Sequence, residues 1–333
     1  MHSACSSLRT QPLNRFLTRE NLLKWAPLLV LIALIAFFSI INPNFLSVRN
    51  FARLFTNASP ALMVAIGVTF IILMGSIDLS MEGAVSALAV IFCYVILWLG
   101  GTVAGLGVLA IPAILLLGAL VGAVNGLIHV HLRIPSFMSS LAMGFVGTGA
   151  AILMTGGNIV KINDEIFRAL LTERVFGFPL MVYVALFFLI VGSVILSHTR
   201  IGRNFYAVGG GEDLAHASGV NVKRVRVWAF ALAGFYFSVA ALLQVAKLGQ
   251  AESVTGSNLM FISITSVVVG GVALWGGIGG VWNALVGVLI VSVINNGMIV
   301  IGIPDFIQDG VLGIMVIIAV ILSTDRRTVA FVK

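Results

Sequence analysis

The sequence contains little charge for its length. Only 9% of its 333 residues are Asp, Glu, Lys or Arg, whereas 60% are hydrophobic and the mean hydropathy is +1.13. A soluble domain carries roughly a quarter charged residues, so a water-soluble fold is excluded for most of the chain. Because a membrane-spanning helix needs about 20 predominantly apolar residues, the composition predicts many such helices and leaves no room for a sizeable soluble domain.

Cysteines and catalytic motifs are also scarce. Cys5 and Cys93 are the only two cysteines, which excludes a disulfide framework. No Gly-Lys pair occurs, and this excludes a P-loop, whose lysine and glycine backbone bind phosphates. A nucleophile elbow and a His-Glu-x-x-His motif are missing too. We therefore predict no catalysis, no cofactor and no metal ion, and the lack of an aromatic-interleaved basic patch argues against nucleic-acid binding.

Long apolar runs occupy most of the chain. Continuous runs of this length predict helices rather than barrel strands, so the fold class is an all-α integral membrane protein with about ten transmembrane helices. The predicted spans are 25–41, 60–76, 82–99, 104–128, 136–155, 180–197, 227–247, 259–275, 281–301 and 308–323. A cleaved signal peptide is the alternative for the first run, but no small-residue cleavage site follows it, which favours a retained span.

The basic residues predict the orientation of these spans. With the N-terminus inside, 13 of the 19 Lys and Arg residues fall in cytoplasmic segments, as the positive-inside rule requires, and both termini are cytoplasmic. We predict a cytoplasmic N-terminal tail (1–24), one transmembrane domain (25–325) with a basic cytoplasmic loop (198–226), and a cytoplasmic C-terminal tail (326–333). The remaining basic residues would lie outside: Arg49, Arg53, Lys161, Arg168, Arg174 and Lys247.

Two apolar segments resemble each other. GAVNGLIHVHLRIPSF (122–137) and GVLIVSVINNGMIVIGIPDF (287–306) both carry Asn-Gly followed by Ile-Pro-x-Phe. In the predicted topology the first helix runs inward and the second outward. Spans 2–5 and 7–10 are thus a possible inverted repeat, an arrangement common in transporters, although chance similarity between apolar segments is the alternative.

Two acidic residues interrupt the apolar sequence at MGSIDLSMEG (74–83). One interpretation is helix capping, with Ser76, Asp78 or Ser80 as the N-cap of the third span and Glu82 complementing the dipole in its first turn. The other interpretation adds a role in a gate or substrate path, because ionisable groups inside a membrane are functional candidates.

Polar residues inside the spans are the other candidates for a translocation path. Asparagine offers donors and acceptors to hydroxyl groups, whereas hydrogen bonding between packed helices is the alternative for each residue. The candidate path residues are Asp78, Ser80, Asn125, Asn295 and Asn296.

Two glycine-rich segments also stand out. GGVALWGGIGGVWNALVG (270–287) is interpreted as a tight turn with close helix packing, or as a break that lines a pore. In the loop 198–226, the glycines 209–211 are expected to break the chain before a short helix over 212–218, which Gly219 would end and after which Asn221 would begin the next helix. A short exposed helix of this kind suits docking into a partner's groove, and an ordinary solvated loop is the alternative.

This loop, TRIGRNFYAVGGGEDLAHASGVNVK (199–223), resembles a segment of the monosaccharide (ribose-type) ABC transporter permeases. The resemblance covers about residues 25–325. Four further segments share it, in the same order as in the family: MGSIDLSMEG (74–83), VNGLIHVHLRIPSFMSSLAM (124–143), VVVGGVALWGGIGGVWNALVG (267–287) and NNGMIVIGIPDFIQ (295–308). The chain departs from the family pattern at Gly75-Ser76, at Met81-Glu82-Gly83 and at Gly211-Glu212-Asp213, which leaves the particular sugar undetermined.

The resemblance implies a permease of the bacterial inner membrane with three protein partners. These are a cytoplasmic ABC ATPase subunit, a periplasmic sugar-binding protein and a second permease copy, in a homodimer or a related heterodimer. The helix over 212–218 would be the coupling helix that enters the ATPase. The implied coupling residues are Gly202, Arg203, Gly209, Glu212, Asp213, Ala215, Ser218 and Gly219.

The predicted function is therefore the permease subunit of an ATP-driven importer for a monosaccharide such as ribose or a related sugar. The principal alternative is an ion-coupled secondary transporter in which Asp78 or Glu82 carries the coupling ion. An integral-membrane enzyme is a third class, for which the sequence contains no motif.

Overall fold

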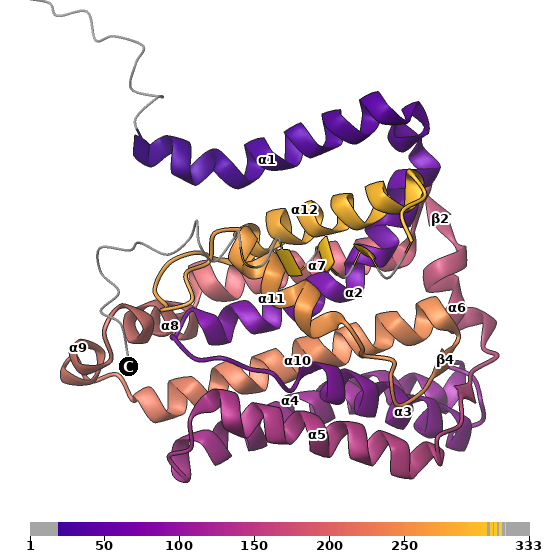
Figure 1. Cartoon of the computed structure of the whole chain (residues 1–333). Coiled ribbons are helices and arrows are strands. Elements are labelled where there is room, and N and C mark those ends of the chain that lie inside the picture. Colours follow the sequence, from indigo (N-terminus) through magenta and orange to yellow (C-terminus); the bar gives the residue numbers. More distant parts are fainter. Residues whose placement is uncertain (1–18, 305–306, 309, 312, 315–316, 318–333) are drawn as a thin grey trace, which may run out of the picture.

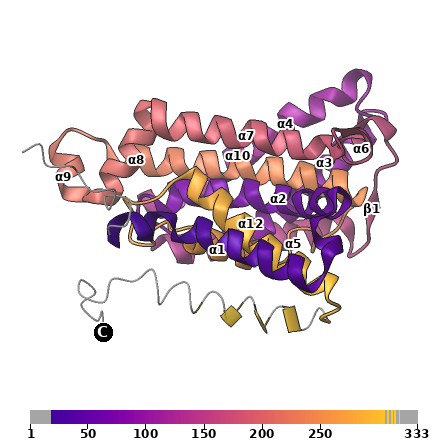
Figure 2. The same cartoon turned by 90° about the horizontal axis from the view of Figure 1, so that it is seen from above.

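The computed structural model describes residues 19–304 together with 307, 308, 310, 311, 313, 314 and 317. Long helices run side by side through the molecule (Figure 1 and Figure 2). They are α1 (Arg19–Ile41), α2 (Val48–Ile72), α3 (Met81–Trp98), α4 (Ala110–His131), α5 (Ser136–Thr155), α7 (Leu180–His198), α10 (Val222–Leu248) and α12 (Val281–Val300). The shorter helices are η2 (Pro43–Leu46), η3 (Gly105–Leu109), α6 (Glu165–Thr172), α8 (Arg200–Gly210), α9 (Glu212–Ala217) and α11 (Leu259–Val269).

Among the described residues, seven helices are long and apolar enough to cross a membrane, namely α2, α3, α4 with η3, α5, α7, α10 and α12. The two shorter apolar helices, Trp25–Ile41 and Leu259–Val269, lie at the first and eighth predicted spans. The eighth ends six residues earlier than predicted because Gly271 adopts a φ of 93° and turns the chain. These helices confirm the all-α membrane fold. Residues 19–24, predicted to belong to the N-terminal tail, form the start of α1, whereas residues 1–18, most of the tenth predicted span and the predicted C-terminal tail lie outside the described residues.

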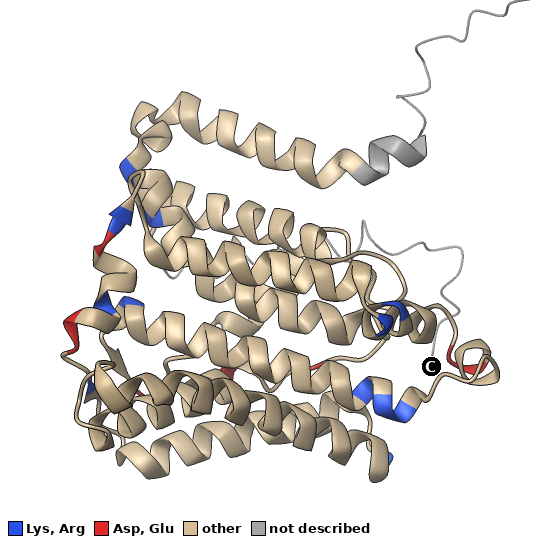
Figure 3. Cartoon of the chain, turned by 180° about the vertical axis from the view of Figure 1, so that it is seen from behind, with Lys and Arg blue, Asp and Glu red and all other residues tan. Residues whose placement is uncertain are grey.

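Charged residues gather at the two ends of the bundle and leave its middle largely apolar (Figure 3). Helices α8 and α9 lie at one end, which we call the α9 end, and α6 lies at the opposite, α6 end (Figure 2). At the α6 end, β1 (Val160–Lys161) pairs antiparallel with β4 (Gln250–Ala251), and β2 (Arg174–Val175) pairs with β3 (Phe178–Pro179). The basic loop 198–226 and the segment 156–179, which carries both acidic and basic residues, therefore lie at opposite ends, as the charge pattern predicts.

The core forms around α2 and α10, which are almost entirely buried. Glycines let α10 approach α4 closely: a Cβ on Gly122 would overlap the Phe230 carbonyl oxygen, and a Cβ on Gly234 would overlap that of Gly118. In contrast, α4, α5 and α7 expose large apolar side chains such as Leu153. This distribution suits a bundle whose outer helices face lipid, where the surface need not be polar.

Each of the two central helices is followed by an irregular stretch and then a shorter helix. The stretch after α2, residues 73–80, is here named the Asp78 break and leads into α3; the stretch after α10, residues 249–258, is named the Gly256 break and leads into α11. The end of α2 lies at the α9 end, where Gly277 N donates to Leu73 O, whereas α10 ends at the α6 end beside β4. The same order of elements therefore runs in opposite directions, as the possible inverted repeat predicts.

Candidate translocation path and coupling surface

Asp78 is buried in the Asp78 break and holds its backbone. Its carboxylate accepts hydrogen bonds from Ser80 N at 2.7 Å and from Ser80 Oγ at 2.6 Å, and only 2% of the residue is exposed. Ser80 occupies the N-cap position of α3, as predicted, but its own side chain makes no capping bond. The acidic group thus sits beside a helix N-terminus, where the dipole and two donors compensate for its burial.

Helix α5 supplies further hydrogen bonds to the Asp78 break. Ser136 Oγ accepts from Ile77 N at 3.0 Å, and Ser140 Oγ accepts from Leu79 N at 2.9 Å. A Cβ on Gly83 would overlap the Gly144 carbonyl oxygen, so α3 and α5 touch through their backbones. Irregular backbone at membrane depth requires such protein partners. Sequence reasoning missed both serines, whose only signal is their i, i+4 spacing at the start of α5.

The Gly256 break rests on the first turns of α3. Ser86 Oγ accepts from Gly256 N at 2.9 Å, and Glu82 Oε1 accepts from Met260 N at 3.4 Å. Asn258, the N-cap of α11, has a left-handed φ of 67° and no side-chain capping bond. Glu82 lies in the first turn of α3, as predicted, but it also supplies the acceptor that the N-terminus of α11 lacks, which the sequence did not indicate.

The asparagine candidates do not form one site. Asn296 Nδ2 donates to Asn50 Oδ1 at 3.0 Å, and Asn50 Nδ2 donates to Phe45 O, so Asn296 joins α12 to α2 and η2. Asn125 on α4 is 1% exposed, and neither of its amide atoms has a partner among the described residues. The Oδ1 atom of Asn295 is likewise buried without one. Only Asp78 and Ser80, among the five candidates, are seen in direct contact.

The predicted coupling loop, 198–226, folds into two helices, α8 and α9. As predicted, α9 covers most of 212–218, Gly219 follows it with a φ of 83°, and the Asn221 side chain caps α10 by accepting from Arg224 N. The predicted break over 209–211 is wrong for Gly209 and Gly210, which belong to α8; only Gly211 lies between the helices. Both glycines continue the last turn of α8, and Gly209 also packs against other backbone segments, a contact that the local sequence does not reveal.

Within this loop, one ion pair connects α9 to α10. Arg226 Nη2 and Glu212 Oε2 are 2.6 Å apart. Gly202 N donates to Thr199 Oγ1, which caps α8. The remaining predicted coupling residues differ in their exposure to solvent. Arg203, Asp213 and Ser218 are exposed, whereas Ala215 is buried. The loop therefore exposes polar side chains together with the apolar Leu214, and the ion pair fixes α9 against α10.

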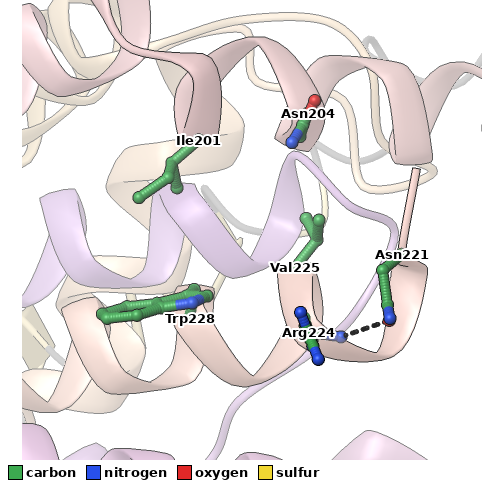
Figure 4. Close-up of a pocket in the computed structure, with 6 residues that line it drawn as sticks. All are labelled: Ile201, Asn204, Asn221, Arg224, Val225 and Trp228. Carbon is green, nitrogen blue, oxygen red and sulfur yellow. Dashed lines mark hydrogen bonds between the residues drawn. The ribbon is translucent and has the colours of Figure 1, made fainter. Parts of the chain in front are cut away.

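A groove of about 220 Å³ separates α8 from α10. Figure 4 shows Ile201 and Asn204 on one wall and Arg224 and Trp228 on the other. Within the described part of the chain, no group of three His, Cys, Asp or Glu residues could hold a metal ion.

Known proteins resemble this chain over nearly its whole length. The family described as branched-chain amino acid transport system / permease component matches residues 50–320. The ribose import permease protein RbsC of Escherichia coli K12 is 30% identical over 317 residues, 94% of this chain and 97% of the relative. The Bacillus subtilis RbsC is 35% identical over 312 residues (91% and 93%), and the L-arabinose transport system permease protein AraH of E. coli K12 is 32% identical over 294 residues (87% of each).

No solved structure matches the chain significantly. The family match covers well over half of the sequence, and the relatives align with it almost from end to end. The members are transport components, so membership confirms the prediction that the chain is not an enzyme. The chain is a multi-pass membrane protein and belongs to the branched-chain amino acid transport system / permease component family.

Proposed function

We propose that this chain is the membrane permease subunit of an ATP-driven importer for a monosaccharide, ribose or a related sugar. The observation that carries the proposal is the alignment of more than nine-tenths of the chain with more than nine-tenths of two ribose import permeases. An arabinose permease at similar identity supports the sugar class and leaves the particular sugar open. The residues 25–325 would act as one transmembrane domain of the bacterial inner membrane.

The proposed partners follow from the two ends of the bundle. A cytoplasmic ABC ATPase would dock at the α9 end, and a periplasmic sugar-binding protein would dock at the α6 end, with both termini of the chain in the cytoplasm. In support, α9 is short, lies at the tip of the molecule and exposes Leu214, of which 75% is accessible. A second permease copy, identical or related, would complete the transporter. The exposed apolar faces of α4, α5 and α7 suit contact with that copy or with lipid.

The proposed path runs between the two breaks. Asp78 and Ser80 would line it at the start of α3, and Asn125, Asn295 and Asn296 would add polar groups from α4 and α12. The buried and unpartnered amide of Asn125 supports this role, because such a group is costly unless a water or substrate hydroxyl meets it. Asn296 has the weakest support, since its amide nitrogen already donates a hydrogen bond to Asn50 Oδ1.

Replacing residues 212–218 with a Gly/Ser linker tests the coupling role. We expect the variant to insert into the membrane normally and to lose copurification with the ABC ATPase. A milder change, Leu214→Ser, should weaken copurification, whereas Ile166→Ser removes a comparably exposed apolar side chain on α6 and should not. Unchanged copurification of the linker variant would contradict the proposal.

The ion-coupled alternative has a direct test of its own. Purified chain in liposomes, without an ATPase or a binding protein, is given a proton or sodium gradient and radiolabelled ribose. Gradient-driven uptake would overturn the proposed ATP-driven mechanism. We expect no uptake, because the hydrogen bonds of Asp78 and Glu82 hold the breaks of this bundle.

A further inference from the structure

Three backbone segments meet at the α9 end of the bundle. They are the end of α2 with the first residues of the Asp78 break, the last turn of α8, and the loop 270–280 between α11 and α12. We call this meeting point the glycine junction and define it by Leu73, Gly75, Gly209, Gly276 and Gly277. Gly277 N donates a 2.9 Å hydrogen bond to Leu73 O, so two of the segments are bonded directly.

The junction excludes side chains. A Cβ on Gly209 would overlap both the Leu73 carbonyl oxygen and the Gly277 nitrogen. A Cβ on Gly276 would lie 2.8 Å from Gly75 N and 3.0 Å from Gly209 Cα. Gly276 and Gly277 also have φ values of 96° and 74°, which glycine adopts without strain. All three segments therefore touch through main-chain atoms.

A second contact holds α8 to the same loop. Tyr206, one turn before Gly209, donates its hydroxyl to Gly279 O at 2.8 Å. Burial raises the pKa of Tyr206, so the hydroxyl keeps its proton as a donor at neutral pH. Helix α8 is thus attached to the loop 270–280 at two points and to the end of α2 at one.

We infer that the glycine junction transmits displacement of α8 and α9 to the Asp78 break and to the α11–α12 loop, with Gly209 as its positioning residue. The inference rests on the proposed function, in which an ATPase moves α9. Close-packed main-chain contacts pass a shift on, whereas long side chains in the same place would absorb it by changing rotamer. Because Leu73 leads into Asp78 and Gly277 lies between α11 and α12, one shift of α8 would reach both halves of the bundle.

Adjacent glycines provide a matched test in the chain alone. Gly209→Ala should separate the junction, whereas Gly210→Ala, whose Cβ would meet nothing within 4 Å, should not. We expect hydrogen exchange at the Gly277 amide to become roughly fivefold to tenfold faster in Gly209→Ala, the size expected for the loss of one hydrogen bond. Identical exchange in the two variants would overturn the inference.

A milder pair of variants guards against misfolding of Gly209→Ala. Tyr206→Phe removes only the bond to Gly279 O, and Tyr183→Phe removes an equivalent 2.8 Å bond to Val175 O at the α6 end. Faster exchange in the loop 270–280 is expected for Tyr206→Phe alone. Equal behaviour of the two tyrosine variants would count against the junction.

The second measurement uses the complex with its ABC ATPase. In the wild-type complex, ATP with vanadate should change exchange in both 73–80 and 270–280. When the response is compared per bound ATPase, Gly209→Ala should lose it, while Gly210→Ala keeps it. A retained response in Gly209→Ala would overturn the inference. A wild-type chain that binds no ATPase would overturn the proposed function instead, and the exchange of the chain alone would still decide whether the junction exists.

Discussion

The Asp78 break and the Gly256 break follow equivalent helices but are held differently. The Asp78 break contains its own acceptor, the Asp78 carboxylate, and takes two further acceptors from the serines of α5. The Gly256 break and the start of α11 instead use hydrogen-bond acceptors of α3, namely Ser86 Oγ and Glu82 Oε1. Within the break, Glu252 N donates to Thr255 Oγ1 at 2.8 Å. One break is stabilised by a buried acidic side chain of its own, and the other by acceptors on a neighbouring helix and by close packing.

The two breaks also differ in how directly they contact α8, the helix that would move in the proposed mechanism. The Asp78 break begins at the glycine junction and is therefore one contact away from α8. The described contacts of the Gly256 break are instead with α3, α10, α11 and β1. Motion from the α9 end would reach the Gly256 break along α10, which begins beside α9 and leads into this break, whereas α3 adjoins both breaks.

The largest effect is expected from overfilling the Gly256 break. A Cβ on Gly256 would overlap the Glu82 carbonyl oxygen, and main-chain atoms have no rotamer with which to avoid it. Gly256→Val should lower the free energy of unfolding by about 3 kcal/mol, measured by equilibrium unfolding in mixed micelles. Gly149→Ala is the control, because that Cβ would meet nothing within 4 Å. Similar stability of the two variants would show that the Gly256 break is loosely packed.

An intermediate effect is expected at the Asp78 break. Asp78→Ala leaves the buried donors of Ser80 without their acceptor, which should cost about 2 kcal/mol of folding free energy. Asp78→Asn keeps one acceptor oxygen and should cost less than half as much. Equal losses in both variants would mean that the negative charge, and not the acceptor, holds this break. The same unfolding measurement separates the two outcomes.

The smallest effect is expected at Glu82, which bridges the two breaks. Its bond to Met260 N is long, and the side chain is half-buried, so Glu82→Val should reduce stability by less than about 1 kcal/mol. Transport of labelled sugar by the assembled importer should stay within twofold of the wild-type rate, and Glu82→Gln should be indistinguishable from it. Loss of transport in Glu82→Val without loss of stability would place Glu82 in the substrate path.

Local signals in the sequence were sufficient to predict most of the helices. The apolar runs predicted the long helices, and Gly219 and Asn221 correctly predicted the boundary between α9 and α10. The three N-cap candidates Ser76, Asp78 and Ser80 include the observed cap of α3, Ser80. These features depend on neighbours within a few residues, because capping and helix periodicity are properties of a single turn.

Partners that are distant in the chain could not be predicted in this way. Ser140 meets Leu79 across 61 residues, and Asn296 meets Asn50 across 246. Glycines 209 and 210 are identical residue types, yet a Cβ would overlap another backbone segment only at Gly209. The residues within one helical turn of Gly209 and Gly210 do not indicate which of the two contacts another segment.

The sequence by itself determined the membrane class, most helices, the short helix at 212–217 and the polar interruption at Asp78. Hydrophobicity and capping act locally, so they can be read without a fold. Only the tertiary structure decided which groups satisfy the two breaks, that Glu82 serves α11 as well as its own helix, and that Gly209 joins three segments. Those roles depend on which backbones approach each other, and helix packing alone brings them together.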